Sequence, residues 1–172
     1  MPWMATPKDK INLALEHVER IRQQTLARGG VKRALGQQSN QATVRSLVDL
    51  GAGDGRVCIE AAKYHGYKAT GIELNPVLIA LSYYRALQAG TLSSTVSAST
   101  GLLIKASVLS QVTFRMTDFW AVPLASFDVI TVFGVRSIME RLETKLTEEA
   151  AKDLFVVCYR FPLPNKQPVY SK

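Results

Sequence analysis

The chain has 172 residues, which is the length of about one domain. Its composition, 47% hydrophobic and 20% charged, is that of a globular protein and excludes a disordered one. No apolar run approaches the roughly 18 residues of a membrane span, the first residues lack the pattern of a signal peptide, and the two cysteines have neither metal-ligand spacing nor a disulfide framework.

Positive charge is concentrated near the N-terminus. The net charge is +7, and residues 1–45 carry five of these charges. A basic segment of this kind suits nucleic acid or an anionic membrane face, and it also suits the solvated face of a helix. Because acidic residues interleave with the basic ones, we favour the solvated face.

The first expected element is an N-terminal helix within residues 1–30. Thr6 is expected to cap it, with Pro7 at the first helical position. Apolar residues then recur at helical spacing until Gly29 and Gly30 end the helix. Residues 31–43, rich in Gln, Ser and Asn, are expected to form a loop.

Strands and helices alternate through the rest of the chain. Strands are expected at 44–50, 68–73, 112–117, 127–133 and 154–159, and helices at 55–65, 75–90 and 136–151. The Ser/Thr-rich stretch 91–107 is interpreted as a flexible insertion and 165–172 as a tail. This order predicts one α/β domain over 1–172 with its core at 44–164, a Rossmann-like, mostly parallel sheet with helices on both faces.

A glycine-rich turn follows the first expected strand. The stretch Val48–Arg56 reads V-D-L-G-A-G-D-G-R, with glycine at 51, 53 and 55. A dinucleotide fingerprint, G-x-G-x-x-G, would need its third glycine at position 56, which is Arg56. The D-x-G-x-G-x-G pattern instead resembles motif I of S-adenosylmethionine (SAM) dependent methyltransferases, where the turn passes beside the amino-acid end of a ligand without pyrophosphate.

Two acidic residues end the next two strands. Glu73 stands 22 residues after Gly51, a spacing at which a carboxylate accepts hydrogen bonds from ribose hydroxyls, although a surface or capping glutamate is the alternative. Asp118 is a candidate partner for an adenine amino group, with Phe119 or Trp120 packing on the ring; the alternative is a turn aspartate followed by core aromatic residues.

Two further carboxylates belong to the turn itself. Asp49 is a candidate to orient the N–H groups of the turn or to meet the ammonium of a ligand. Asp54 is a candidate ligand contact. Alternatively, its negative charge interacts favourably with the positive end of the dipole of the helix that begins here. The turn, Glu73 and Asp118 all fall at carboxyl ends of strands, where ligands bind in parallel sheets. No catalytic residue is assigned and no metal is expected, because transfer from an activated sulfonium needs alignment rather than acid–base chemistry.

The chain resembles the seven-strand SAM-dependent methyltransferases over about residues 45–164. Within them it is most similar to the protein-lysine methyltransferases of the mitochondrial ATP synthase C-subunit and adenine nucleotide translocase, and to their prokaryotic relatives. The resemblance rests on six blocks: Val48–Arg56, Gly71–Pro76, Ser82–Arg85, Asp118–Trp120, Val132–Val135 and Cys158–Pro162.

The resemblance implies SAM as cofactor and a protein with an acceptor lysine, such as a small membrane protein, as substrate. It implies a mitochondrial location in a eukaryote and a cytoplasmic one otherwise. Family members continue into two more strands after the Cys158–Pro162 block, and the mitochondrial ones carry a hydrophobic anchor before the domain. No corresponding segments are recognised in this sequence, and we expect both features to be missing here. The residues expected to bind SAM are Asp49, Gly51, Gly53, Asp54, Gly55, Glu73, Asn75, Asp118 and Phe119.

Two alternatives remain open. One is a methyltransferase acting on RNA or on a small molecule. It is disfavoured because Phe133–Arg136 stands where base-methylating enzymes carry an Asn/Asp-Pro-Pro-Tyr/Phe motif, and because the chain has no Pro-Cys nucleophile. The other alternative is a SAM-fold protein that binds a partner without catalysis.

Overall fold

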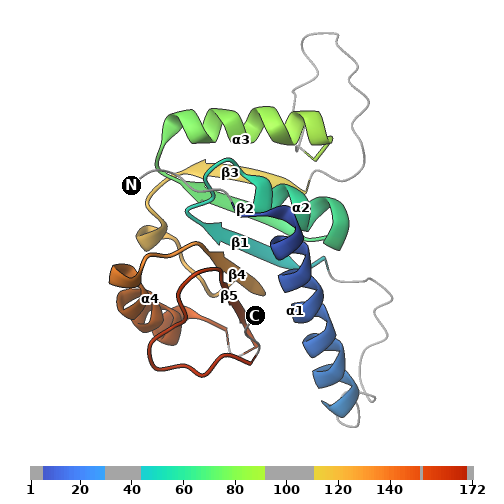
Figure 1. Ribbon diagram of the computed structural model, residues 1–172, viewed down its shortest axis with the longest axis vertical. Coiled ribbons are helices and arrows are strands. Elements are labelled where there is room, and N and C mark those ends of the chain that lie inside the picture. Colours follow the sequence, from blue (N-terminus) through green and yellow to red (C-terminus); the bar gives the residue numbers. More distant parts are fainter. Residues whose placement is uncertain (1–5, 30–43, 92–110, 152, 170–172) are drawn as a thin grey trace.

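The computed structural model describes residues 6–29, 44–91, 111–151 and 153–169 (Figure 1). The loop expected at 31–43 and the insertion expected at 91–107, apart from Thr91, lie outside the described residues. The described elements are, in chain order, α1 (Lys8–Gly29), β1 (Ser46–Leu50), α2 (Arg56–His65), β2 (Lys68–Glu73), α3 (Pro76–Ala89), β3 (Val112–Met116), the 3-10 turn η1 (Phe119–Ala121), β4 (Val129–Val132), α4 (Arg136–Glu149) and β5 (Phe155–Cys158).

The described strands form one parallel sheet, as predicted. Its five strands lie in the order β3-β2-β1-β4-β5, and no sixth or seventh strand occurs among the described residues. The strand ends are aligned, because Leu50 pairs with both Ile72 and Val132, and Glu73 pairs with Met116. The chain extends to one side of β1 through β2 and β3 and to the other through β4 and β5. The strand order therefore switches beside β1, where open α/β sheets bind ligands.

Both faces of the sheet are covered (Figure 1). Alternate side chains of a strand point to opposite faces. Leu47 and Val129 accordingly pack with residues of α1, α2 and α3, whereas Val48 and Ile130 pack with residues of α4. All four side chains are fully buried, and their burial is the main source of stability for the central strands.

Local capping signals fix several helix ends. The Asn75 side chain accepts a hydrogen bond from the Val77 N–H with Pro76 at the first turn of α3, as expected. Gly66 ends α2 in the left-handed conformation. The predicted start of α1 is wrong by a residue: the Pro7 carbonyl accepts the first helical hydrogen bond, from Ile11, and the helix begins at Lys8.

The first and fourth strands of the prediction are longer than β1 and β4. The Asp128 carboxylate accepts hydrogen bonds from the Ser46 N–H at 2.8 Å and from its hydroxyl at 2.9 Å. The Asp128 N–H also donates to the Ser46 carbonyl at 3.0 Å, so these side-chain bonds supplement backbone pairing where the two strands begin. Val44, before the first strand, is 61% exposed. Among the described residues no helix is long and apolar enough to span a bilayer.

Candidate functional site

The glycine turn is held onto the end of β2 by its own backbone. The N–H groups of Gly51 and Ala52 donate to the Ile72 carbonyl at 2.9 and 2.8 Å, and the Gly53 N–H donates to Glu73 Oε2 at 3.0 Å. The Gly55 N–H donates to the Ala52 carbonyl at 2.9 Å. Because four N–H groups of the turn already have partners in the protein, the turn is not a cradle of free donors for a phosphate.

Two glycines of this turn have different surroundings. Gly51 and Gly55 both have left-handed φ angles, of 83° and 75°. A Cβ on Gly55 would lie 2.5 Å from Phe114 and 2.8 Å from the Ser82 side chain, so this glycine is required for packing. A Cβ on Gly51 would meet no described atom within 4 Å. Gly51 therefore leaves space beside the backbone that a ligand can use.

A cavity of about 250 Å³ opens beside Gly51. Its floor comes from the carboxyl ends of β1, β4 and β5 and the residues after them, and its roof from the start of α1. The lining residues are Thr6, Lys10, Ile11, Ala14, Leu15, Asp49, Gly51, Ala52, Asp54, Arg56, Val57, Thr131, Val132, Phe133, Val135, Val157 and Tyr159. The cavity thus lies at the switch in strand order.

Asp49 brings a carboxyl group into this cavity. It is 4% exposed and accepts a hydrogen bond from the Thr131 hydroxyl at 2.7 Å. Burial raises the pKa of this carboxyl to about 7; the Thr131 hydrogen bond opposes the rise and the charge of Glu73 adds to it. A cationic ligand group at this position would favour the ionised form, which makes Asp49 a suitable partner for an ammonium.

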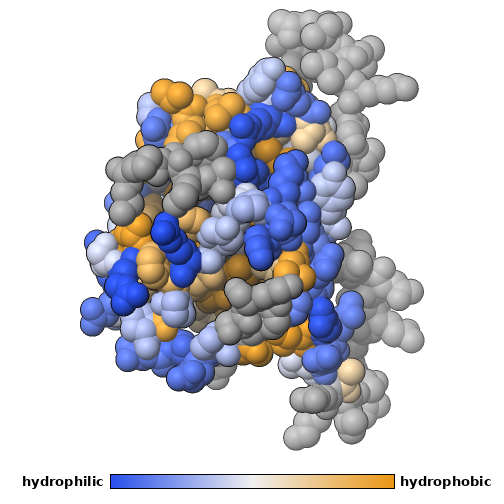
Figure 2. All heavy atoms as spheres, in the orientation of Figure 1, coloured by the Kyte–Doolittle hydropathy of each residue, from blue (hydrophilic) through white to orange (hydrophobic). Residues whose placement is uncertain are grey.

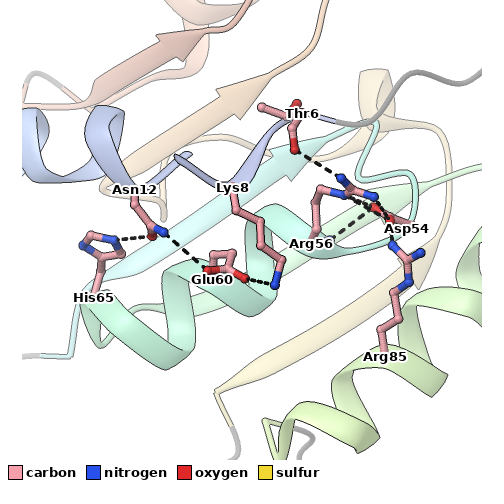
Figure 3. Close-up of polar contacts among 8 residues, drawn as sticks. All are labelled: Thr6, Lys8, Asn12, Asp54, Arg56, Glu60, His65 and Arg85. Carbon is pink, nitrogen blue, oxygen red and sulfur yellow. Dashed lines mark hydrogen bonds and ion pairs between the residues drawn. The ribbon is translucent and has the colours of Figure 1, made fainter. Parts of the chain in front are cut away.

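Asp54 is fully engaged by two arginines (Figure 3). Its carboxylate is paired with Arg56, with Nη2 to Oδ2 at 2.7 Å, and with Arg85 of α3. Arg56 Nη1 also donates to the Thr6 carbonyl at 3.4 Å. These contacts join the turn, α3 and the start of α1, so the Asp54 side chain holds the turn in place.

A second polar group fastens α1 to α2 (Figure 3). The buried Glu60 carboxylate forms an ion pair with Lys8 at 2.7 Å and accepts a hydrogen bond from the Asn12 amide at 3.5 Å. Asn12 Oδ1 lies 2.9 Å from His65 Nε2. Burial lowers the pKa of His65, which favours the neutral ring. These contacts fix the first turns of α1 over the cavity.

Glu73 and Asn75 lie beyond the turn, at the end of β2. Besides the Gly53 bond, the Glu73 carboxylate accepts from the N–H groups of Leu74 and Asn75, both at 2.9 Å. A carboxylate has about four acceptor positions, so Glu73 keeps room for one more donor. Asn75 is exposed, and its side chain caps α3.

Asp118 and Phe119 follow β3 on the same edge. The exposed Asp118 caps η1, accepting from the Trp120 N–H at 3.0 Å. The half-buried ring of Phe119 lies 4.6 Å from that of Trp120, and both rings pack against the core on the α4 face. Asp118 thus lies in a turn followed by partly buried aromatic residues, and one Asp118 oxygen remains for a further donor.

The structure brings together some of the expected site residues and separates others. Asp49, Gly51 and Asp54 line the cavity, whereas Gly53, Gly55, Glu73, Asn75, Asp118 and Phe119 lie outside its lining. The lining also contains residues that were not expected, from α1 and from the ends of β4 and β5, among them Lys10, Phe133 and Tyr159. The rule that ligands meet the carboxyl ends of parallel strands could have identified Phe133 and Tyr159.

The described residues contain no group of three or more His, Cys, Asp or Glu side chains that could hold a metal. The arrangement offers an open backbone at Gly51 beside a buried carboxyl group, and carboxylates at the ends of β2 and β3. Such a site suits a ligand with an ammonium at one end and hydroxyl or amino donors at the other.

Comparison with known proteins gives similarities in sequence and in structure. Residues 93–170 match the family described as ANTKMT methyltransferase domain. The chain is 38% identical to the ATP synthase C-subunit lysine N-methyltransferase of Homo sapiens over 123 residues, 72% of this chain and 45% of that protein. It is 36% identical to the adenine nucleotide translocase lysine N-methyltransferase of Mus musculus over 123 residues, 72% of this chain and 46% of that protein.

Among solved structures, the chain is similar to an RNA methyltransferase from Salinibacter ruber in complex with S-adenosyl-L-homocysteine. The TM-score is 0.70 at 25% sequence identity, over 97% of this chain and 84% of the other. The match extends through nearly the whole chain, whereas the chain spans just under half the length of the two lysine methyltransferases.

Proposed function

We propose that this chain, a relative of the lysine methyltransferases of the ATP synthase C-subunit and adenine nucleotide translocase, transfers a methyl group from SAM to a lysine side chain of a protein. The predicted resemblance is confirmed by the sequence matches, and the predicted class I methyltransferase fold by the similarity in structure. The observation that supports the activity best is the cavity, which combines the open glycine turn with an apolar wall at the ends of β4 and β5.

The residues present fit the proposed cofactor. SAM supplies a methyl group already activated by its sulfonium. Gly51 leaves room for the methionine backbone and Asp49 is the partner of its ammonium. Glu73 has one acceptor position left for a ribose hydroxyl, and Asp118 has an oxygen left for the adenine amino group. The proposed site comprises Asp49, Gly51, Gly53, Asp54, Gly55, Glu73, Asn75, Asp118 and Phe119.

The protein's own contribution is alignment and exclusion of water. The start of α1 covers the cavity, held by the contacts of Arg56 with Thr6 and of Glu60 with Lys8. The acceptor lysine must arrive as a neutral amine, because an ammonium has no lone pair. Its nitrogen takes the methyl group as the carbon–sulfur bond breaks and the electron pair of that bond remains on sulfur. The product is the methylated ammonium, and the one proton released overall is the proton that the acceptor ammonium gives up to water before the transfer.

The substrate is proposed from the relatives. The two proteins named above are lysine methyltransferases of the ATP synthase C-subunit and of adenine nucleotide translocase. We extend this to a protein lysine, with a small membrane protein as the first candidate. A mitochondrial location, if the chain is eukaryotic, is part of the same proposal.

RNA is the second candidate acceptor. The solved structure with a TM-score of 0.70 is an RNA methyltransferase, and residues 1–45 carry five of the seven net positive charges. We rank it lower because the two lysine methyltransferases are 36–38% identical to this chain, against 25% for the RNA methyltransferase.

The test uses SAM labelled in its methyl group. The protein is incubated separately with a membrane-protein fraction containing the ATP synthase C-subunit and adenine nucleotide translocase, and with RNA from the same cells. We expect label on a protein lysine. Label only in RNA would replace the lysine proposal, and SAM binding without any labelled product would favour a non-catalytic binding protein.

The chain offers a matched control. Gly51 and Gly66 both have left-handed φ angles, 83° and 68°, and a Cβ on either would meet no described atom within 4 Å. The substitutions Gly51→Ala and Gly66→Ala therefore carry a similar backbone strain. We expect loss of labelling in the first variant only, because Gly51 borders the cavity and Gly66 ends α2.

A further inference from the structure

The cavity has an ionic part and an apolar part. Asp49, Asp54 and Arg56 lie on β1, the turn and the start of α2. Phe133, Val135, Val157 and Tyr159 come from β5 and from the residues that follow β4 and β5. An amino-acid zwitterion belongs in the first part, and a chain of methylene groups belongs in the second.

Two aromatic rings dominate the apolar part. The rings of Phe133 and Tyr159 stack with centroids 5.1 Å apart and an interplanar angle of 28°. Both residues directly follow the last residues of paired strands, and the Tyr159 N–H extends the pairing by donating to the Val132 carbonyl at 3.1 Å. Their backbone is therefore fixed by the sheet, which makes them a more rigid wall than loop residues would be.

Figure 2 shows apolar surface in the middle of the face of the molecule seen in Figure 1, over β4 and β5 and beside the polar residues of α1. Tyr159 is 40% exposed and Phe133 is half-buried. The wall thus reaches from the interior of the cavity to the surface, where an extended side chain of another protein can enter.

From this geometry we infer that Phe133 and Tyr159 form the subsite for the acceptor side chain, which guides the methylene groups of a substrate lysine toward Gly51. The inference rests on the proposed function and specifies where its substrate binds. The two rings supply apolar contact along the stem of the lysine, and their faces also tolerate the positive charge of the methylated product.

The charges around the cavity favour loss of a proton from a substrate lysine as its side chain enters. Lys10 of α1 and Arg56 line it as cations. Of the carboxylates, Asp54 is paired with Arg56 and Arg85, and Asp49 lies beside Gly51 at the ionic end. An ammonium that passes Lys10 meets a like charge, which favours the neutral amine needed for attack. The remaining titratable group of the lining is the Tyr159 hydroxyl.

The first test measures steady-state methylation of the protein acceptor. In Tyr159→Ala we expect KM for the acceptor to rise about tenfold or more, while the Kd for SAM stays within about twofold of the wild type. Tyr159→Phe should retain the wild-type KM, because the ring and not the hydroxyl forms the wall. Tyr64→Ala, at an aromatic residue 61% exposed on α2, is the control and should change neither quantity. An unchanged KM in Tyr159→Ala, or an equal loss of SAM affinity, would overturn the inference.

A second test does not depend on turnover. The protein saturated with S-adenosylhomocysteine is titrated with Nα-acetyl-lysine methylamide and separately with adenosine monophosphate, and the ring resonances of Phe133 and Tyr159 are followed by NMR. We expect the lysine derivative alone to shift them. Shifts with the nucleotide alone, or with neither compound, would count against the subsite.

The two proposals can fail separately. If the lysine derivative shifts these rings and no protein lysine is ever methylated, the proposed function fails and the subsite stands. If a protein lysine is methylated and Tyr159→Ala leaves its KM unchanged, the function stands and the subsite is wrong.

Discussion

Glu73 at the end of β2 accepts a hydrogen bond from the Gly53 N–H at 3.0 Å, so the carboxylate expected to bind a ribose also holds the glycine turn. The same carboxylate accepts from the N–H groups of Leu74 and Asn75. The proposed contact with the cofactor and the shape of the turn therefore depend on one side chain, and we expect substitutions there to affect both.

The first prediction concerns this link. Glu73→Ala should weaken SAM binding about tenfold or more and lower the free energy of unfolding by about 1–3 kcal/mol, because backbone donors lose a partner. Glu73→Gln should also weaken binding, because the amide nitrogen that replaces one carboxylate oxygen cannot accept, so the side chain loses either the Gly53 bond or the bonds of Leu74 and Asn75. Calorimetric titration and urea unfolding measure the two effects. Glu140→Ala, an exposed position on α4, is the control, and unchanged SAM affinity in Glu73→Ala would remove Glu73 from the site.

The second prediction separates two glycines of one turn. Gly55→Ala should destabilise the fold by about 2–4 kcal/mol, because it adds the strain of a left-handed residue to a collision with Phe114 and Ser82. Gly51→Ala should lower the free energy of unfolding by about 1–2 kcal/mol, because it adds the backbone strain without a collision. Thermal unfolding of both variants tests the difference. Equal stabilities would mean that the Phe114 ring can move away from Gly55.

The third prediction is a pH dependence at Asp49. Its pKa in the folded protein is about 7, above the ordinary 3.8, so folding favours the protonated carboxyl. This group's contribution to stability is therefore fully present below about pH 4, declines by at most about 1.4 kcal/mol per pH unit as the pH rises to about 7, and is constant above that.

Asp49→Asn isolates this effect. The amide oxygen can still accept the hydrogen bond of Thr131, and the variant carries no buried charge. We expect it to exceed the wild type in stability at pH 8, to match it near pH 4, and to bind SAM more weakly at pH 8. Urea unfolding at several pH values gives the difference in the free energy of unfolding between the two proteins. The contributions of the other titrating groups are common to both proteins and cancel in this difference. A less stable variant at pH 8 would contradict the assignment.

The fourth prediction concerns the pairing of Asp54. Asp54→Asn removes the carboxylate that pairs with Arg56 and Arg85, and should lower the free energy of unfolding by about 2–3 kcal/mol. This is less than for a fully buried pair, because both arginines are partly exposed. Arg85→Ala leaves Asp54 paired with Arg56 and should cost about 1 kcal/mol or less. Chemical denaturation at low and high salt compares the two. The ranking is wrong if Arg85→Ala proves the more damaging change.

Features that depend only on neighbouring residues could be predicted from the sequence. The turn at Gly51–Gly55 was predictable because only glycine adopts its left-handed angles without strain. Asn75 and Pro76 marked the start of α3 because a cap acts within one helical turn. The alternation of strand and helix patterns then indicated the parallel sheet, and with it the common edge near which Asp49, Glu73 and Asp118 lie.

The closure of the cavity and the charges that meet there depend instead on how the elements pack. Thr6, expected to cap a helix, lines the cavity because α1 packs against α2, a contact between distant segments that no local pattern specifies. The pairing of Asp54 with Arg85 depends on where α3 lies over the turn. The stacking of Phe133 on Tyr159 depends on β4 and β5 being neighbours in the sheet. Contacts of this kind join residues that are far apart in the sequence. They depend on how whole helices and strands pack, so only the tertiary structure decides them.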